Sequence, residues 1–346
     1  MQPAAVRVGV IVVNWNGAAQ LRACLDAFLA QDVGALEVVV VDNASSDGSA
    51  GVLRAYAADA RVRVVWNASN RGFAGGVNDG LAATDAPVIA VANFDVVPQP
   101  DYLRHAVAAL DAHPRRGSVQ GKLVRTTRGP AGEAVIDTTG HLAFRTRLFR
   151  NRGEGEVDRG QWEQAGQVFG VSGALALYRR AMLDDVAVRG LVLDERLFAY
   201  WEDVDLDWRA ALRGWEAWYE PAAVATHERG GAGPRRTRRV EALNYANRLL
   251  VVAKCDAPGR LARALPGVLF TTALKTLDLL VSHPLALPAA LARLRHLPAM
   301  LADGRALRAD AVVGPEQVVD RWFAAFDYAR WLRTWWRRVR GRAPGH

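Results

Sequence analysis

Cysteine and lysine are scarce in this sequence of 346 residues. The two cysteines, Cys24 and Cys255, are too far apart to form a C-x-x-C redox or zinc motif, and their low number fits a reducing, cytosolic setting. Because lysine is so rare, arginine supplies almost all of the positive charge behind a net charge of +8. A basic surface attracts phosphate-bearing partners, but solvated arginines in a generally basic proteome give the same composition.

Long apolar runs are missing as well. No uncharged apolar stretch reaches the roughly 18 residues that a membrane-spanning helix needs, so we expect no such helix. The first apolar run, residues 8–13, is too short for a signal peptide and is typical of a strand. We therefore expect a cytoplasmic protein, and we attribute the Asn-Ala-Ser triplets at Asn43 and Asn67 to chance rather than to glycosylation.

Three common motifs of α/β enzymes are also absent. No G-x-x-x-x-G-K-[ST] segment occurs, which argues against a P-loop. The first predicted strand ends in Asn14-Trp15-Asn16-Gly17 rather than in G-x-G-x-x-G, which argues against an NAD-type Rossmann turn. No G-x-S-x-G occurs either, which argues against an esterase of the common α/β type.

The first hundred residues nevertheless alternate between strand and helix patterns. They predict strands at residues 8–14, 36–41, 62–66 and 87–92, and helices at residues 18–30, 49–58 and 75–83. This order predicts an α/β fold with a mostly parallel sheet and right-handed crossovers. Further on, the patterns predict a helix over 98–114, a strand over 168–178, a helix from residue 179 and a strand over 217–226. Residues 117–166 mix Arg and Gly with hairpin-like strands, and we interpret them as an insertion over a substrate cleft.

From residue 240 onward, Leu, Ala and Arg recur at helical spacing. We therefore predict a domain of residues 1–239 and a helical C-terminal region of residues 240–346. The stretch 320–340 combines six arginines with aromatic side chains, among them Trp322, Trp331, Trp335 and Trp336. A basic helix of this kind can lie in a membrane interface, or it can pack on its own domain with its arginine stems pointing outward.

Polar side chains collect where four consecutive predicted strands end. The pairs are Asn14 and Asn16, Asp42 and Asn43, Asn67 and Asn70, and Asn93 and Asp95. Ligands of open parallel sheets bind at the carboxyl ends of the strands. Loops are polar in any protein, but four consecutive ends rich in Asn and Asp favour a binding site at this edge.

Two of these turns have residues suited to a phosphorylated ligand. Residues 42–49 follow a buried strand, and a carboxylate there can accept hydrogen bonds from a base N–H or from ribose hydroxyls. Residues 70–78 form a glycine-rich turn that opens a helix, where the backbone can approach a phosphate closely and Arg71 adds positive charge. Asp95 alone is weak evidence for a metal, but Mg²⁺ often takes one or two carboxylates plus substrate phosphates.

Residues 200–208 hold four carboxylates within six positions, namely Glu202, Asp203, Asp205 and Asp207. One of them could be a general base. Alternatively, they form an acidic helix start that is balanced by Arg209 and Arg213. His227 follows the last predicted strand of the domain, and a single histidine is more often structural than a metal ligand.

Taken in order, these segments resemble the inverting family 2 glycosyltransferases of the GT-A fold, especially the bacterial rhamnosyltransferase-like and galactofuranosyltransferase-like members. The resemblance spans residues 8–233 and implies that Asp203 is the catalytic base. It implies a metal, Mg²⁺ or Mn²⁺, bound by Asp95 at the last position of a D-x-D motif and by His227. The first position of that motif is Asn93, so strict metal dependence does not follow. The implied donor-binding residues are Asn14, Asn16, Asp42, Asn43, Asn70, Arg71, Gly72, Gly75, Asn78 and Asn93, and Trp201, Glu202 and Asp205 would serve the acceptor or support the site.

The activity implied by the resemblance is transfer of a sugar from a dTDP- or UDP-linked donor, with rhamnose as the first choice. The acceptor would be a hydroxyl of a glycan or of a lipid-linked sugar, used in cell-surface polysaccharide synthesis at the inner face of the membrane. Two alternatives are a nucleotidyltransferase, which also uses a nucleotide-binding α/β domain and a metal, and a non-catalytic protein of the same fold that binds nucleotide sugars. Nucleic-acid binding through the arginines would show only steep salt dependence, and we expect no nucleic-acid partner.

Overall fold

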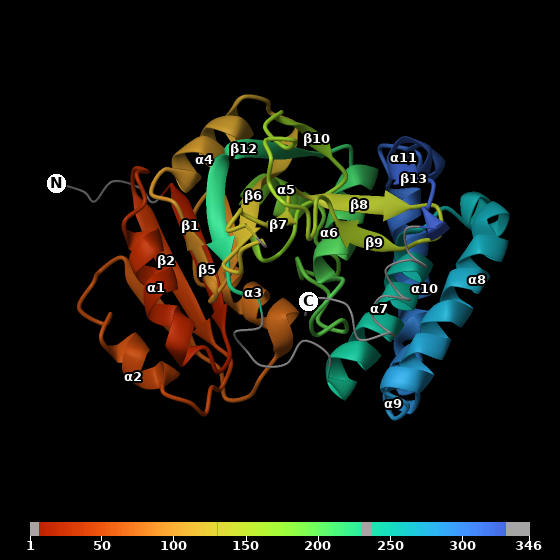
Figure 1. Ribbon diagram of the computed structural model, residues 1–346, viewed down its shortest axis with the longest axis horizontal. Helices are drawn as coiled ribbons and strands as arrows, with labels where there is room; N and C mark the ends of the chain where they lie inside the picture. The colour runs from red at the N-terminus through yellow and green to blue at the C-terminus, as the bar shows by residue number, and fades with distance from the viewer. Residues whose placement is uncertain (1–6, 130, 230–236, 330–346) are drawn as a thin grey trace.

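The structure is a computed structural model that describes residues 7–129, 131–229 and 237–329 (Figure 1). Its main feature is one large mixed sheet in the order β10-β12-β6-β11-β4-β1-β2-β3. These strands span Gly166–Val168 (β10), Glu216–His227 (β12), Arg116–Arg125 (β6), Leu175–Arg179 (β11), Val88–Asn93 (β4), Val8–Asn14 (β1), Leu36–Asp42 (β2) and Val62–Trp66 (β3). Two short strands, β5 (Val96–Pro98) and β7 (Ile136–Thr138), pair with β12 and β6.

The four strands predicted from the first hundred residues form the parallel part of this sheet, which confirms the α/β prediction. β1 pairs in parallel with both β2 and β4, and β2 pairs in parallel with β3. In this register Asn14 lies opposite Asp42, and Val13 lies opposite Asn93. The carboxyl ends of the strands therefore meet at one edge, as the polar strand ends require.

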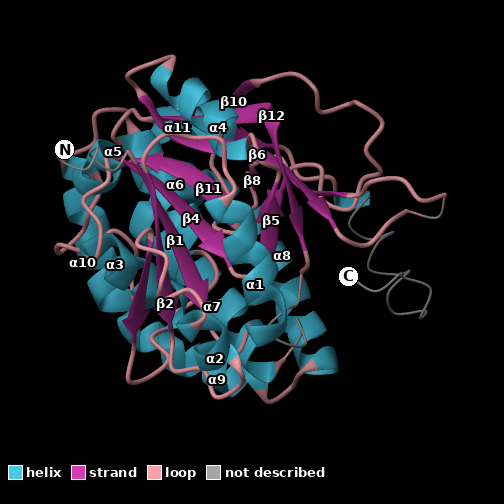
Figure 2. Ribbon diagram, turned by 90° about the vertical axis from the view of Figure 1, so that its left-hand side faces the viewer, coloured by secondary structure: helices cyan, strands magenta, loops and turns pink. Residues whose placement is uncertain are grey.

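Helices cover both faces of the sheet (Figure 2). One face packs against α1 (Ala18–Leu29), α2 (Ser49–Arg54) and α4 (Tyr102–Asp111). The other face packs against α3 (Gly72–Ala82), α5 (Arg180–Asp185) and α6 (Glu202–Leu212). Because both faces are covered, the strands are continuous apolar runs, and every residue of β1 is buried.

The interpretation of residues 117–166 as an insertion over the substrate cleft is wrong for its first part. β6 lies in the middle of the sheet between β11 and β12, and its central residues are buried. The glycines of β6 made the strand difficult to predict from the sequence. A Cβ on Gly121 would lie 2.3 Å from the carbonyl oxygen of Ala223, and one on Gly117 would lie 2.6 Å from Met182. Close approach of neighbouring elements, rather than flexibility, accounts for these glycines.

The region after residue 237 is mainly helical, as predicted, and lies on the right of Figure 1. It comprises α7 (Arg238–Cys255), α8 (Pro258–Ser282), α9 (Ala286–Arg293), the short 3₁₀ helix η1 (Leu294–His296), α10 (Leu297–Ala309) and α11 (Pro315–Trp322). A small sheet of β8 (His141–Phe144), β9 (Phe149–Asn151) and β13 (Phe323–Ala324) joins this region to the main domain. One apolar cluster unites it with α6 through Trp208, so the two predicted units share a core.

The predicted basic helix over 320–340 is not one helix. α11 ends at Trp322, and the next two residues form β13, which pairs with β8. Phe323 is buried, with its ring centroid 5.0 Å from that of Trp208 and 5.6 Å from that of Phe149. These aromatic side chains fill the chain's own core, since ring packing of this kind is favourable without a membrane. Residues 330–340, with the remaining tryptophans, lie outside the described part of the chain.

The expectation that the chain has no helix able to span a membrane also needs correction. Within the described residues, α8 is long and apolar enough to do so by length and composition alone. Its most apolar window of 18 residues has a mean hydropathy of 1.4, and 17% of that window is buried. Lys275 and Asp278 interrupt the apolar run, but they do not offset the leucines around them.

Candidate active site

Asp42 organises the first two strand ends into one hydrogen-bonded turn. Its Oδ1 accepts from the side-chain amide of Asn14 at 2.7 Å and from the hydroxyl of Ser45 at 2.7 Å, and its Oδ2 accepts from the Ser45 backbone N–H at 3.1 Å. Asn16, at φ 54°, accepts from the Ser46 backbone N–H through its side chain at 2.8 Å. The predicted residues Asn14, Asn16 and Asp42 therefore lie together, with Asn14 and Asp42 both buried.

Asn43 links this turn to the glycine-rich turn. Its side-chain amide donates to the carbonyl oxygen of Gly72 at 2.8 Å. Asn70 accepts from the Gly72 backbone N–H at 2.8 Å, and Gly72 has φ +74°. A Cβ on Gly72 would lie 2.2 Å from the Phe198 carbonyl oxygen, so only glycine fits there. The turn thus packs directly on the segment that leads to α6.

The far end of the same turn is tied down by charge. Arg71 forms ion pairs with Asp79 and, at 2.7 Å, with Glu195. Asn78 donates to the backbone carbonyl of Leu193 at 2.9 Å and accepts from the Leu193 backbone N–H at 3.0 Å. These contacts use the polar atoms of Asn78 inside the protein and leave the Arg71 side chain 39% exposed.

Asp95 and His227 are brought together, as predicted. The Nε2 atom of His227 lies 3.2 Å from Oδ1 of Asp95, and its Nδ1 atom lies 2.8 Å from Oδ2 of Asp137. Burial lowers the pKa of His227, but the hydrogen bonds to Asp137 and Asp95 outweigh burial and raise it to about 9. Asp137 in turn contacts Arg229, and Arg125 lies 3.5 Å away.

This pair has the donor atoms of a divalent metal site, at which a cation would displace the Nε2 proton that the raised pKa of His227 retains at neutral pH. A search of the described residues finds no group of three or more His, Cys, Asp or Glu side chains that could hold a metal. Two facing donors are sufficient if phosphates complete the coordination, as is common for Mg²⁺. Adjacent ligands of an octahedral ion at about 2.1 Å lie about 3 Å apart, which fits the Asp95–His227 separation. Asp137 on Nδ1 is the outer carboxylate that orients a metal-binding histidine.

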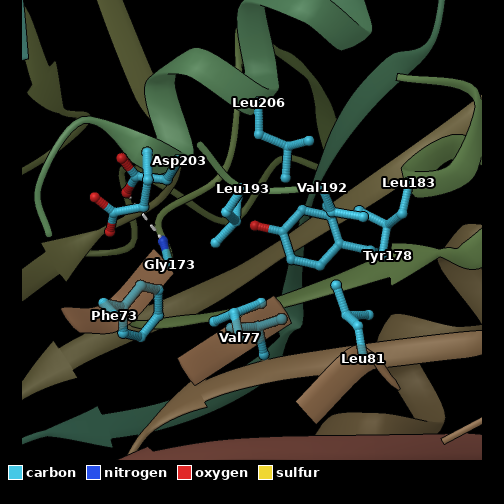
Figure 3. Close-up of a pocket in the computed structure, with 12 residues that line it drawn as sticks. Phe73, Val77, Leu81, Gly173, Tyr178, Leu183, Val192, Leu193, Asp203 and Leu206 are labelled. Carbon is cyan, nitrogen blue, oxygen red and sulfur yellow. Dashed lines mark hydrogen bonds between the residues drawn. The ribbon is translucent and has the colours of Figure 1, made fainter. Parts of the chain in front are cut away.

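Asp203 lies close to the strand that carries Asn93. Its Oδ2 accepts from the Gly173 backbone N–H at 3.1 Å (Figure 3), and the next carbonyl, that of Ala174, accepts from the Asn93 backbone N–H at 2.9 Å. Phe73 of the glycine-rich turn lines the same cavity as Gly173 and Asp203. The predicted base, the D-x-D segment and the glycine-rich turn are thus neighbours.

The acidic cluster of α6 divides its charges among three environments. Asp203 is partly exposed. Burial raises the pKa of Glu202 well above its usual range, helped by the charges of Asp203 and Asp205, and so favours its uncharged form. Asp205 is fully buried and pairs at 2.9 Å with both Lys254 and Arg209. Asp205 therefore supports the helix from inside, whereas Asp203 faces the cavity.

The segment before α6 has a strained backbone. Phe198, Tyr200 and Trp201 have φ of 65°, 67° and 74°, which non-glycine residues rarely adopt. The side-chain amide of Asn247 on α7 donates to the carbonyls of Leu197, Ala199 and Tyr200 at 2.8, 3.0 and 2.8 Å. Each such conformation costs about 1–3 kcal/mol and persists only where its surroundings fix it. This segment sets the position of Asp203.

Sequence reasoning missed four residues of this site, namely Ser45, Asp137, His141 and Asn247. The last comes from the predicted helical region, and only the tertiary structure brings it to the site. Asp137 and His141 lie in the segment interpreted as an insertion. An acid and a histidine on either side of Gly140 were the available signal.

Comparisons with known proteins identify the family and the fold of the chain. The model of the family described as Glycosyl transferase family 2 matches residues 9–187, just over half of the chain. Succinoglycan biosynthesis protein ExoO of Rhizobium meliloti (strain 1021) is 35% identical over 105 residues, which are 30% of this chain and 30% of that protein. N-acetylglucosaminyl-diphospho-decaprenol L-rhamnosyltransferase of Mycobacterium tuberculosis is 27% identical over 239 residues, which are 64% of this chain and 75% of that protein. The chain thus matches only about a third of the first of these relatives.

Among solved structures, mannosyltransferase PcManGT from Pyrobaculum calidifontis, in complex with GDP-Man and Mn²⁺, superposes with a TM-score of 0.51. The match covers 89% of this chain and 81% of that chain at 23% identity. At this identity the likeness concerns the fold, which is of the GT-A type.

Proposed function

The chain belongs to glycosyl transferase family 2, and on that premise we propose that it transfers a sugar, with inversion, from a nucleoside diphosphate to an acceptor hydroxyl. The observation that carries this proposal is the meeting of three elements at one sheet edge. These are the Asp42 and Gly72 turns, the Asp95–His227 pair and the partly exposed Asp203. A donor along the turns would place its diphosphate toward Asp95 and its sugar toward Asp203.

In the proposed reaction, Asp203 takes the proton from the acceptor hydroxyl. The acceptor oxygen forms a bond to the anomeric carbon on the face opposite the diphosphate. The bond from that carbon to the diphosphate oxygen breaks, and the nucleoside diphosphate leaves with the electron pair. A divalent cation held by Asp95 and His227 supplies positive charge beside the diphosphate. The rest of the site contributes orientation, which can account for much of the rate.

Within the donor site we propose different roles for the predicted residues. Asp42, Asn14 and Asn16 would face the base and ribose, since they form the turn at the sheet edge. Asn70 and the backbone at Gly72 and Gly75 would lie along the donor. Asn43, Arg71 and Asn78 would hold the turn in place, because their polar atoms already bind other parts of the protein. Asn93 would reach ribose or metal-bound water, and Trp201 would support the acceptor side.

The donor proposal predicts a metal-dependent thermal shift. We expect UDP or dTDP to raise the melting temperature more with Mn²⁺ than without it, because the diphosphate completes the coordination of Asp95 and His227. At about 100 times its dissociation constant, such a ligand stabilises the protein by roughly 2.7 kcal/mol. GDP, CMP, NAD and ATP are compared in parallel. A response to GDP alone would change the proposed base, and a response only to NAD or ATP would overturn the donor site.

We propose that α8 contacts an anionic membrane, which would bring the active site close to a lipid-linked acceptor. Exposed apolar side chains line this helix, namely Leu265, Leu269, Phe270, Leu277, Leu280 and Val281. Exposed Arg263 and Arg295 lie near the two ends of the α8–α9 segment, and the chain carries a net charge of +8. An apolar helix face with flanking arginines is the chemistry of an interfacial helix.

This contact predicts co-sedimentation with vesicles of phosphatidylcholine and phosphatidylglycerol. We expect Leu269→Glu together with Leu280→Glu to weaken vesicle binding about tenfold or more, because both side chains would lose apolar burial. Val312→Glu is the matched control, since Val312 is 67% exposed but lies in the loop before α11. Absence of wild-type binding to these vesicles, or equal loss in the Val312 variant, would reject membrane contact through α8.

A further inference from the structure

The strands β7 and β8 bring one side chain to each of the two reactive parts of the site. They are joined by a tight turn in which Gly140 has φ +119°, a conformation that requires glycine. Asp137, on β7, binds Nδ1 of His227. His141, at the start of β8, contacts α6 instead. The turn is anchored through the His141 backbone N–H, which donates to the Gly170 carbonyl at 2.9 Å.

His141 lies between two carboxylates of α6. Its Nδ1 atom is 2.7 Å from Oδ2 of Asp207, and its Nε2 atom is 3.6 Å from Oδ2 of Asp203. Asp203 and Asp207 are one helical turn apart, so a single imidazole ring reaches both. The ring is buried, whereas Asp203 keeps 20% of its side chain exposed toward the cavity.

Asp207 is itself held rigidly, so it fixes the orientation of the imidazole. Its two carboxylate oxygens each accept from the Val171 backbone N–H at 3.1 Å. A Cβ on Gly170 would lie 1.8 Å from Asp207 Oδ2, which shows how closely the backbone encloses this carboxylate. A carboxylate on one imidazole nitrogen leaves the other nitrogen aimed at a defined point. Here that point is Asp203.

The charges around His141 favour its protonated form. Burial lowers the pKa of His141, but the charges of Asp203 and Asp207 and the hydrogen bond to Asp207 outweigh burial and raise it. Burial raises the pKa of Asp207 to about 6, so this carboxyl is mainly ionised at neutral pH. Asp203 and Asp207 are the titratable groups that face the ring.

We propose that His141 is a positioning residue that keeps Asp203 ionised and oriented for proton abstraction, with Asp207 as its anchor. This rests on the proposed role of Asp203 as the base. A positive ring beside Asp203 stabilises its carboxylate form against the negative charge of Asp207. Together with the Gly173 N–H, it also fixes Oδ2. Through Asp137 and His141, the turn between β7 and β8 thus orients both His227 of the metal pair and the base Asp203.

The test uses His141→Asn, in which the shorter amide can still donate to Asp207 but no longer reaches Asp203. We expect kcat at neutral pH to fall about tenfold or more, with donor binding by thermal shift unchanged. We expect the acid limb of the kcat profile to move to higher pH by about one unit or more, because Asp203 loses a neighbouring positive charge and becomes easier to protonate. His141→Gln, which reaches Asp203 without a charge, should recover part of kcat but keep the displaced acid limb.

His105→Asn is the matched control, because His105 on α4 forms a similar contact at 3.2 Å with Asp101, the residue that precedes this helix, away from the site. It should behave as wild type. An unchanged acid limb in both His141 variants would overturn the proposal, even if kcat falls, since a purely structural role lowers activity without moving the pH profile. Failure of the proposed function looks different, because the wild type then transfers no sugar or Asp203→Asn remains active.

Discussion

Asp203→Asn is expected to lower kcat by about 10³-fold or more while donor binding stays near the wild-type level. The substitution keeps the size and shape of the side chain, and an amide oxygen can still accept from the Gly173 backbone N–H, as Oδ2 does at 3.1 Å. It removes the ability to take a proton, together with the hydrogen bond that Oδ1 accepts from the Val204 backbone N–H at 2.8 Å and the negative charge that faces His141. The measurement is single-turnover sugar transfer, combined with the Mn²⁺-dependent thermal shift that reports donor binding.

The neighbouring Glu202 provides a demanding comparison. Burial and the charges of Asp203 and Asp205 raise the pKa of Glu202 well above its usual range, which favours the uncharged acid that a neutral amide resembles. Glu202→Gln should therefore retain kcat within about tenfold of the wild-type value, although Glu202 and Asp203 are adjacent in the sequence. Asp184→Asn, on the exposed side of α5, controls for the loss of a surface charge. Equal losses in the Glu202 and Asp203 variants would contradict the assignment of the base.

The parallel half of the fold is readable from the sequence because its signal is local. Each strand is buried on both faces, so residues such as those of β1 form an apolar run that needs no tertiary information. β6 is different, because Gly117 and Gly121 are set by neighbours that are distant in sequence. The aromatic residues near Trp322 show the same limit. Composition gives their apolarity, but only the pairing of β13 with β8 shows that the chain itself covers Phe323.

The residues of the site that lie at the ends of strands can be predicted from the sequence, because the strands themselves can. Asn14 and Asp42 are the last residues of β1 and β2, Asp95 follows β4, and the parallel strands end at one edge. The sequence does not tell which polar groups are already used by the fold. Asn78 binds the backbone of Leu193, and Asp205 binds Lys254, through contacts across more than 40 residues. Asp205 is thus paired inside the protein, whereas Asp203 on the same helix faces the cavity, and only the tertiary structure shows this difference.

The second large effect concerns the metal. Asp95→Asn is expected to abolish the Mn²⁺-dependent part of donor binding and to lower kcat by about 10²-fold or more, since an amide is a poor substitute for a carboxylate on a hard cation. Donor binding without Mn²⁺ should remain, because the Asp42 and Gly72 turns lie on other strands. Titration of Mn²⁺ at a fixed concentration of the responding nucleotide measures both parts.

Asp85→Asn is the matched control because Asp85 precedes the same strand, β4, that Asp95 follows. It is exposed, and it lies at the amino end of the parallel strands. The site is at the carboxyl ends, so this variant should titrate as wild type. Equal Mn²⁺ dependence in wild type and Asp95→Asn would show that the cation binds elsewhere. Full wild-type activity in the presence of a chelator would show that the reaction needs no cation, in which case the protonated His227 beside Asp95 would be the group that supplies positive charge there.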